Sequence, residues 1–302
     1  MTAQTSIAQS SIAIQPRRTR LRSTLLYFKR NPNLAIGLFM LVALIAFTIV
    51  GLFRVDPADG YAGAVRASQP PSAKYAFGTD GQGRDMYTVA VLGTWVTLEI
   101  GFIAAAIGMG LGVFLGFTSA YFGGWIDSIL RWVIDVFMTI PGFVILIVLA
   151  ALVGGKVSTE GTGLIIALFL WAGPARVVRS QVLSLRERQF VQMAKLNGLN
   201  DMRIIFEELI PNLLPFLGAQ LISAVMSAVY ASSGLAILGL GNLREPQLGT
   251  TLYWMSGQGA VVRGMWWWVA VPVVLLCWLF VMLYLISSGM DELANPRLRR
   301  RQ

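Results

Sequence analysis

Residues that could do chemistry are sparse in this sequence. Its 302 residues include no histidine and a single cysteine, Cys277, which lies inside an apolar run. One cysteine excludes an intrachain disulfide, and without histidine the commonest metal and acid–base chemistry is poorly supplied. No set of nucleophile, base and orienting group is visible either. The sequence therefore predicts a non-catalytic chain with no catalytic residues, no metal site and no bound cofactor of its own.

One glycine-rich segment, GTDGQGRD at residues 78–85, has a glycine spacing similar to that of phosphate-binding loops. It lacks the Gly-Lys-Ser/Thr ending of such loops, and no apolar run that could form a buried strand precedes it. No Walker-type loop occurs elsewhere in the sequence. We interpret the segment as turn chemistry, because glycine and aspartate favour tight turns.

Two carboxylates, Glu99 and Asp135, lie within or near long apolar segments. A carboxylate in lipid is costly unless it is paired or hydrated, so each is a candidate residue of a translocation path. The alternative is structural: both are expected near the ends of their spans, where water could hydrate them. Arg131, one helical turn before Asp135, could also pair with it. We favour the structural role and keep the translocation path as the alternative.

The elements that must position these residues are set by composition. With 56% hydrophobic and 13% charged residues, the chain cannot fold as one soluble domain without large exposed apolar patches. Apolar stretches long enough to cross a bilayer as helix occur near 34–53, 92–120, 129–153, 162–178, 213–240 and 266–288. We therefore predict an all-α integral membrane protein with six transmembrane helices in a lipid bilayer, the first of them retained rather than cleaved as a signal peptide.

Charge gives the expected orientation. Six spans place both termini on one side, and 17 of the 24 Lys and Arg residues fall in the segments on that side. The positive-inside rule makes that side cytoplasmic. The basic residues lie beside apolar runs rather than along one polar face, which argues against a nucleic-acid partner. The predicted organisation is a cytoplasmic N-terminal segment (1–33), a first transmembrane helix (34–53), an extracytoplasmic loop (54–91), a five-helix core (92–290) with a cytoplasmic loop (186–211) between spans 4 and 5, and a basic cytoplasmic tail (291–302).

The second span carries small residues every four positions. They are Ala104, Gly108, Gly112, Gly116 and Ala120. This spacing places them on one helix stripe, where a neighbouring backbone can approach closely. The stripe is expected to pack within the chain's own bundle or against a second subunit, and in neither case does it face lipid.

A polar segment, RERQFVQMAKLNGLNDMRIIFEELIP at 186–211, separates the fourth and fifth spans. Its first half predicts a short helix with Phe190, Met193 and Ala194 on one face, ended by Gly198. Its second half predicts an amphipathic helix capped by Asn200 or Asp201 and ended by Pro211, with apolar positions Met202, Ile205, Phe206 and Leu209. The segment is thus expected to form a helix–turn–helix that lies among lipid headgroups or, as we favour, contacts a protein partner.

The run QMAKLNG, followed after twelve residues by Pro211, resembles the E-A-A-x-x-x-G cytoplasmic loop of permease subunits in ATP-binding-cassette importers. Gln192 replaces the glutamate, Met193 the first alanine, Ala194 matches the second alanine and Gly198 the glycine. Further stretches are similar to the dipeptide and oligopeptide permeases of this class: FGTDGQGRDM (77–86), AYFGGWID (120–127), ARVVRSQVLSLRERQFV (175–191), LGLG (238–241) and NPRLR (295–299). The resemblance covers about residues 75–302, and its motifs keep their order.

The resemblance implies a subunit of the prokaryotic plasma (inner) membrane that pairs with a homologous permease subunit. Its other partners would be two cytoplasmic ATPase subunits, which bind ATP and Mg, and an extracytoplasmic solute-binding protein. The ATPase-coupling residues would be Phe190, Val191, Gln192, Met193, Ala194, Lys195, Asn197, Gly198, Asp201, Arg203 and Pro211. The departures at Gln192 and Met193 suggest a loop adapted to its own ATPase.

Peptides are the expected cargo by this resemblance, and relatives that carry oligosaccharides, opines or nickel leave those as alternatives. A function from another class is an ion-coupled carrier or channel, which would use charged groups near the midplane rather than a cytoplasmic docking helix.

Overall fold

The computed structural model describes residue 28 and residues 31–154 and 157–294. Most of the predicted N-terminal segment (1–33) and basic tail (291–302) therefore lies outside the described residues. The described part is helical, and its only β-type pairing is an isolated bridge between Thr79 and Asp85. These findings confirm the all-α fold class.

Four helices of the described chain are long and apolar enough to cross a membrane. They are α2 (Pro32–Leu52), α3 (Met86–Phe122), α10 (Ile210–Ile237) with the helical turns before it, and α12 (Trp266–Ala294). Two further spans are bent pairs, formed by α4 (Gly124–Thr139) with α5 (Gly142–Val153) and by α6 (Thr159–Leu170) with α7 (Ala172–Arg186). Counting each pair as one span gives the six that the sequence predicts.

The bends have local causes. The predicted third span, 129–153, turns by 74° between α4 and α5. Ile140 is extended there because it precedes Pro141, whose ring disfavours the helical conformation at the preceding residue. The fourth span bends by 47° at Trp171, and Pro174 in the first turn of α7 supplies no backbone N–H. Helix α7 continues to Arg186, well beyond the predicted span end at residue 178.

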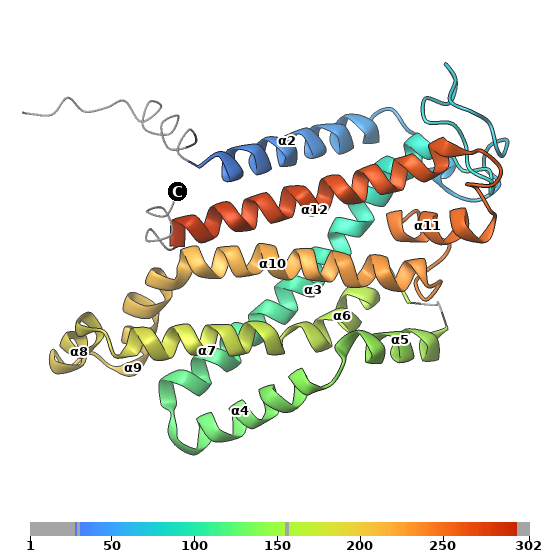
Figure 1. The fold of residues 1–302 in the computed structure, drawn as a ribbon. Coiled ribbons are helices and arrows are strands. Elements are labelled where there is room, and N and C mark those ends of the chain that lie inside the picture. The colour runs from blue at the N-terminus through green and yellow to red at the C-terminus, as the bar shows by residue number, and fades with distance from the viewer. Residues whose placement is uncertain (1–27, 29–30, 155–156, 295–302) are drawn as a thin grey trace, which may run out of the picture.

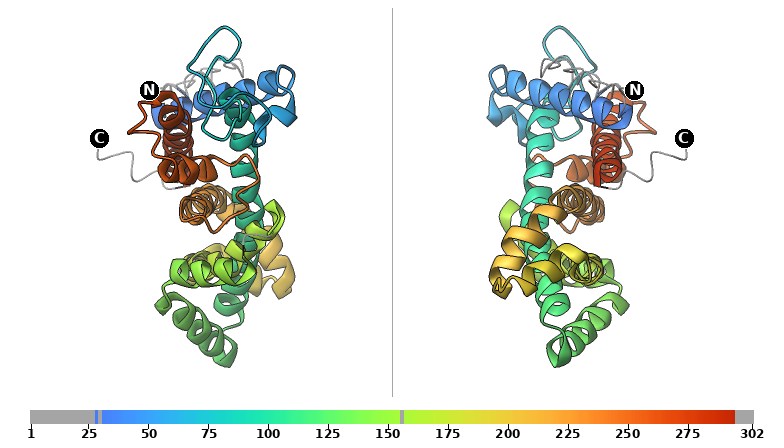
Figure 2. Two further views of the ribbon diagram at one scale, coloured as in Figure 1. Left: turned by 90° about the vertical axis from the view of Figure 1, so that its right-hand side faces the viewer. Right: turned by 90° about the vertical axis from the view of Figure 1, so that its left-hand side faces the viewer.

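The helices stack in a row, and α3 crosses the row. Figure 1 shows α2, α12, α10, the α6–α7 pair and the α4–α5 pair lying one beneath another, and the end-on views in Figure 2 show the same order. Helix α3 contacts α2, α12, α10, α6, α7 and α4. It is therefore the element that holds the row together.

The small-residue stripe of α3 explains how closely its neighbours approach. A methyl group on Gly112 would lie 2.7 Å from the Trp171 carbonyl oxygen, and one on Gly116 would lie 2.6 Å from that of Ala175. Ala104 and Ala120 are fully buried. Of the two predicted roles of the stripe, the structure confirms packing within the chain, because the backbone of the α6–α7 pair occupies this face.

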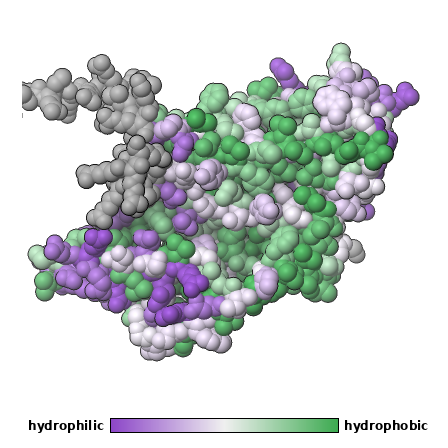
Figure 3. All heavy atoms as spheres, viewed as in Figure 1, coloured by the Kyte–Doolittle hydropathy of each residue, from purple (hydrophilic) through white to green (hydrophobic). Residues whose placement is uncertain are grey.

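Polar residues gather at the two ends of the molecule, and a broad apolar band separates them (Figure 3). One end carries residues 54–85, which we call the cap; it includes η1 (Pro57–Gly60) and lies near α11 (Leu248–Gly257). The other end carries residues 187–209, which we call the protrusion; it contains α8 (Gln189–Leu196), α9 (Asp201–Arg203) and the π-helix η2 (Ile204–Leu209). The predicted 54–91 loop is shorter than expected, because Asp85 accepts a bond from the Thr88 N–H and starts α3 at Met86.

The glycine-rich segment forms a closed turn in the cap. The buried Asp80 carboxylate accepts hydrogen bonds from the backbone N–H groups of Gln82 and Arg84 and from Arg84 Nε at 2.5 Å. Gly78 and Gly83 have φ values of +71° and +76°, which side chains rarely adopt. The segment is therefore built around its own carboxylate, as expected of turn chemistry rather than of a phosphate cradle.

Candidate functional site

The protrusion is a helix–turn–helix, as predicted. Gly198 has φ +76° and follows α8, and the Leu199 N–H donates to the Ala194 carbonyl at 3.1 Å, which closes the helix end. Asn200 caps the second helix, because its Oδ1 accepts from the Arg203 N–H at 2.8 Å. The predicted break at Gly198 and the cap at Asn200 are both confirmed.

The faces of α8 differ from the prediction. Val191 and Ala194 are buried in the main core with Ile204 and Leu209, whereas Met193 is 57% exposed and Leu196 is 81% exposed. The expectation that Ala194 shares an outer face with Met193 is wrong, because α8 folds back and packs its Val191–Ala194 side against α7 and η2. Ala194 thus anchors the protrusion to the bundle.

The predicted apolar stripe of the second helix is likewise divided between buried and exposed side chains. Leu209 is buried and Ile205 is half-buried, while Met202 and Phe206 are exposed. The prediction assumed 3.6 residues per turn, but residues 204–209 form a π-helix, whose wider turns rotate successive side chains differently. The protrusion therefore presents five exposed apolar side chains, those of Phe190, Met193, Leu196, Met202 and Phe206.

Pro211 does not end the second helix, so that prediction is wrong. The chain is helical without interruption from Asp201 to Ile237, and Pro211 lies in the first turn of α10. A proline ring collides with the carbonyl four residues earlier in a regular helix. Directly before Pro211 the helix is wider, because the Ile210 N–H bonds to the Ile205 carbonyl five residues earlier. The second helix of the protrusion and α10 consequently form one continuous helix.

The polar residues of the protrusion tie it to the end of α3. Asp201 accepts a hydrogen bond of 2.6 Å from the Tyr121 hydroxyl, and the Lys195 ammonium lies 5.7 Å from the centre of the Tyr121 ring. Next to the protrusion, Arg186 at the end of α7 donates to the Ala120 carbonyl at 2.6 Å. The sequence analysis missed Tyr121 and the role of Arg186, since both act across long sequence separations. Gln192 and Asn197 are exposed, and Arg203 forms an exposed ion pair with Glu207 at 3.6 Å.

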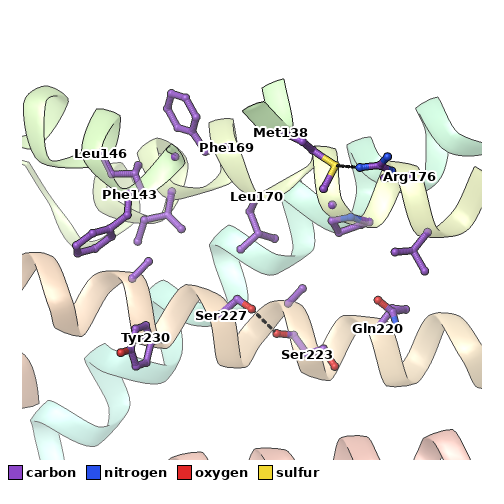
Figure 4. A pocket seen from close by; sticks show the side chains of 17 residues that line it. Met138, Phe143, Leu146, Phe169, Leu170, Arg176, Gln220, Ser223, Ser227 and Tyr230 are labelled. Carbon is purple, nitrogen blue, oxygen red and sulfur yellow. Dashed lines mark hydrogen bonds between the residues drawn. The ribbon is translucent and has the colours of Figure 1, made fainter. Parts of the chain in front are cut away.

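A cavity of about 590 Å³ lies in the apolar band between α10 and the two bent helix pairs. Figure 4 shows a row of polar side chains from α10 along one wall: Gln220, Ser223, Ser227 and Tyr230. Their spacing of three, four and three residues places them on one helix face. The sequence analysis missed this row, although its helical spacing within an apolar span was a usable signal.

The opposite wall of the cavity is apolar. It is formed mainly by Phe143 and Leu146 of α5 and by Ile166, Phe169 and Leu170 of α6. Arg176 of α7 is the charged member of the lining within the described residues. The cavity is thus amphipathic, with hydrogen-bonding groups on α10 facing large apolar side chains, and its volume suits a small organic ligand.

The two predicted carboxylates have different surroundings. Asp135 is paired with Arg131 at 3.7 Å, as expected, and with Arg176 at 3.6 Å, which brings it beside the cavity. Glu99 is half-buried on α3 and is not among the residues that line the cavity. Helix α3 begins at Met86, and Glu99 lies thirteen residues, ~20 Å, further along it.

The family model "Binding-protein-dependent transport system inner membrane component" matches residues 108–300, which include the protrusion, α10 and the whole cavity lining. The chain belongs to this family. It is therefore a multi-pass inner-membrane component of a transport system, in agreement with the resemblance read from the sequence. The match covers every position of the QMAKLNG loop.

Curated relatives agree with this assignment. The dipeptide transport system permease protein DppC of Bacillus subtilis is 32% identical over 90% of this chain and 84% of its own length. The oligopeptide transport system permease protein OppC of Mycobacterium tuberculosis (strain H37Rv) is 29% identical over 76% of this chain and 79% of its own.

A solved structure supports the fold. A chain of the inward-facing MetNI methionine ABC transporter aligns with a TM-score of 0.54 at 21% identity, covering 70% of this permease and 96% of that chain. The similarity shows a shared helical architecture.

Proposed function

We propose that this chain is one of two permease subunits of an ATP-driven importer of short peptides. Its curated relatives are named as dipeptide and oligopeptide permeases, which supports peptides as the substrate class. The second permease subunit, two ATPase subunits and an extracytoplasmic solute-binding protein complete the transporter. ATP and Mg bind to the ATPases, and this chain binds no cofactor.

In this proposal the protrusion lies in the cytoplasm and the cap outside. The excess of Lys and Arg in the segments on the protrusion side supports this orientation. The exposed Met193, Leu196, Met202 and Phe206 then face the ATPase, since side chains this apolar are costly to leave in water and no element of the described chain covers them.

The observation that carries the proposal is the unbroken helical path from the protrusion to the cavity. The helix from Asp201 to Ile237 carries the exposed Phe206 near one end and the polar row Gln220–Tyr230 further along. The buried contacts of Val191 and Ala194 fix α8 to the same continuous helix. Movement of the ATPases against the protrusion would therefore shift α10 along the cavity wall, which is what alternating access requires.

Uptake of radiolabelled di- and tripeptides into proteoliposomes that contain the complete transporter tests the proposal. We expect uptake that requires the binding protein and ATP and that stops when the catalytic lysine of the ATPase phosphate-binding loop is replaced. Uptake driven by an ion gradient without ATP would establish a secondary carrier instead. ATP-dependent uptake of oligosaccharides, opines or nickel, with none of peptides, would correct the substrate class.

A further inference from the structure

The guanidinium of Arg176 is the unusual group of the cavity. It is a cation on the wall of a cavity that is otherwise lined by uncharged side chains. Its contacts are weak: Nη1 lies 3.5 Å from the Met138 sulfur, and Nη2 lies 3.6 Å from Asp135 Oδ1. A thioether sulfur is a poor acceptor, and an ion pair at this distance lacks a good hydrogen bond. The Arg176 side chain is also 59% exposed, so its guanidinium keeps donors that these two contacts do not satisfy.

Arg179, almost one turn further along α7, is an arginine of the same helix whose guanidinium is held by short hydrogen bonds. Its Nε and Nη2 bind the two oxygens of Asp127 at 2.6 and 2.7 Å, and Nε also lies 3.2 Å from the Ser119 hydroxyl. The pair joins α3, α4 and α7, and neither residue lines the cavity. The loose contacts of Arg176 are thus a local property of that side chain rather than of α7.

Asp135 can release Arg176 at small cost. Its carboxylate is shared with Arg131 at 3.7 Å, so it keeps a cationic neighbour when Arg176 turns to another acceptor. When a ligand carboxylate displaces Asp135, the Arg176 guanidinium exchanges one carboxylate partner for another. The first turn of α7 leaves room for a ligand, because Gly173 has no neighbouring atom within 4 Å of the position that a side chain would take.

We propose that Arg176 binds the terminal carboxylate of the transported peptide and that Asp135 is the internal carboxylate that occupies Arg176 when the cavity is empty. The proposal rests on the function proposed above. Guanidinium and carboxylate form paired, charge-assisted hydrogen bonds, which are stronger than those between neutral groups. Gln220 and Tyr230 on α10 then face the peptide backbone, while the apolar wall accepts its side chains. The Ser223 hydroxyl is already bonded to the Ser287 hydroxyl of α12 at 2.8 Å, and the Ser227 hydroxyl donates to the Ser223 carbonyl at 3.0 Å.

The test compares a dipeptide with a free C-terminal carboxylate and the same dipeptide with a C-terminal amide. Uptake of each is measured with the complete transporter in proteoliposomes, at peptide concentrations that saturate the unchanged binding protein. We expect the wild-type transporter to prefer the acid. Arg176→Gln should lower uptake of the acid by about tenfold or more and leave uptake of the amide unchanged, because one charge-assisted interaction is lost.

Two further variants separate ligand binding from a structural ion pair. Arg131→Gln is the matched control, since it removes a cation from the same carboxylate but not from the cavity wall, and it should keep the acid preference. Asp135→Asn removes the competing carboxylate, so it should keep the preference and not raise KM for the acid. The double variant Arg176→Gln/Asp135→Asn should behave as Arg176→Gln does.

Equal losses of acid and amide uptake in Arg176→Gln, or loss of the acid preference in Asp135→Asn, would show that the pair is structural and overturn the inference. Equal uptake of acid and amide by the wild type would overturn the inference alone. Failure of the wild type to import either peptide would overturn the proposed function as well.

Discussion

Single residues on the protrusion divide into those that hold it and those that it offers to a partner. Val191 and Ala194 are buried in the core of the chain, whereas Met193 and Leu196 lie on the outer side of the same helix. The sequence motif does not distinguish these roles, because the alternation depends on where α7 and η2 pack. The exposed set is therefore the proper target for tests of docking.

Met193→Asp should weaken the ATPase contact without unfolding the protrusion. Met193 is 57% exposed, so the new carboxylate stays hydrated in the isolated subunit but would be desolvated against a partner. We expect loss of ATPase co-purification with a normal amount of subunit in the membrane. Ala194→Asp is the contrasting variant: it places a charge in the core, so protease sensitivity of the protrusion should rise too. A Met193→Asp subunit that retains its ATPase and its transport would exclude Met193 from the docking surface.

Glu99→Gln should change transport by no more than a few-fold. Glu99 is half-buried on α3 but does not line the cavity, so removing its charge leaves the proposed path intact. Uptake by proteoliposomes at matched transporter content measures the effect. Abolished uptake in a normally assembled complex would contradict this prediction. Glu99 would then face a part of the translocation path that is formed only together with the second permease subunit.

For single residues, the sequence predicted local features of the protrusion and of α4 better than the long-range contacts that these residues make. Gly198, Asn200 and the Arg131–Asp135 pair are local features, set by backbone conformation or by one helical turn. Arg176 and Tyr121 gain their roles from groups 41 and 80 residues away, Asp135 and Asp201. Such contacts follow from tertiary packing, which no local pattern contains.

Among the elements, the spans were predictable and their bends were not. Apolar length alone decides whether a helix can cross a bilayer, so the four long spans, and six when each bent pair counts as one, follow from the sequence. Pro141 and Pro211 show why prolines are ambiguous: one separates two helices by a 74° bend, while the other lies inside a continuous helix whose π-turn accommodates it. The outcome depends on whether neighbouring turns can rearrange.

The crossing of α3 over the α6–α7 pair gives a prediction with an internal control. Gly112→Leu places a side chain against the Trp171 carbonyl and Pro174, so α3 and α7 must separate and the bundle should lose ~1–3 kcal/mol or more of stability. Gly110→Leu, two residues earlier on an exposed face with no atom within 4 Å, should be tolerated.

Thermal unfolding of the purified subunit and its level in membranes measure both glycine variants. Equal melting temperatures for Gly112→Leu and Gly110→Leu would mean that the close contact along the stripe does not limit stability.

For the whole molecule, orientation decides whether the protrusion can meet an ATPase at all. The cap and the protrusion lie at opposite ends of the bundle, separated by the apolar band, so fixing the side of either end fixes the other (Figures 1 and 3). The same geometry places the cavity between them. Orientation is thus the property on which the proposed path of coupling depends.

Single cysteines at Ser72 in the cap and at Asn200 in the protrusion test this orientation, since both positions are exposed. The native Cys277 is replaced by serine first, because it is exposed on α12 and would otherwise contribute a second thiol. A charged, membrane-impermeant maleimide should label Ser72→Cys in intact cells and Asn200→Cys only after lysis. The excess of Lys and Arg on the protrusion side favours this result, because positively charged segments beside spans are retained in the cytoplasm. Labelling of Asn200→Cys alone in intact cells would place the protrusion outside, away from ATP, and the coupling role of Met193, Leu196 and Phe206 would fall with it.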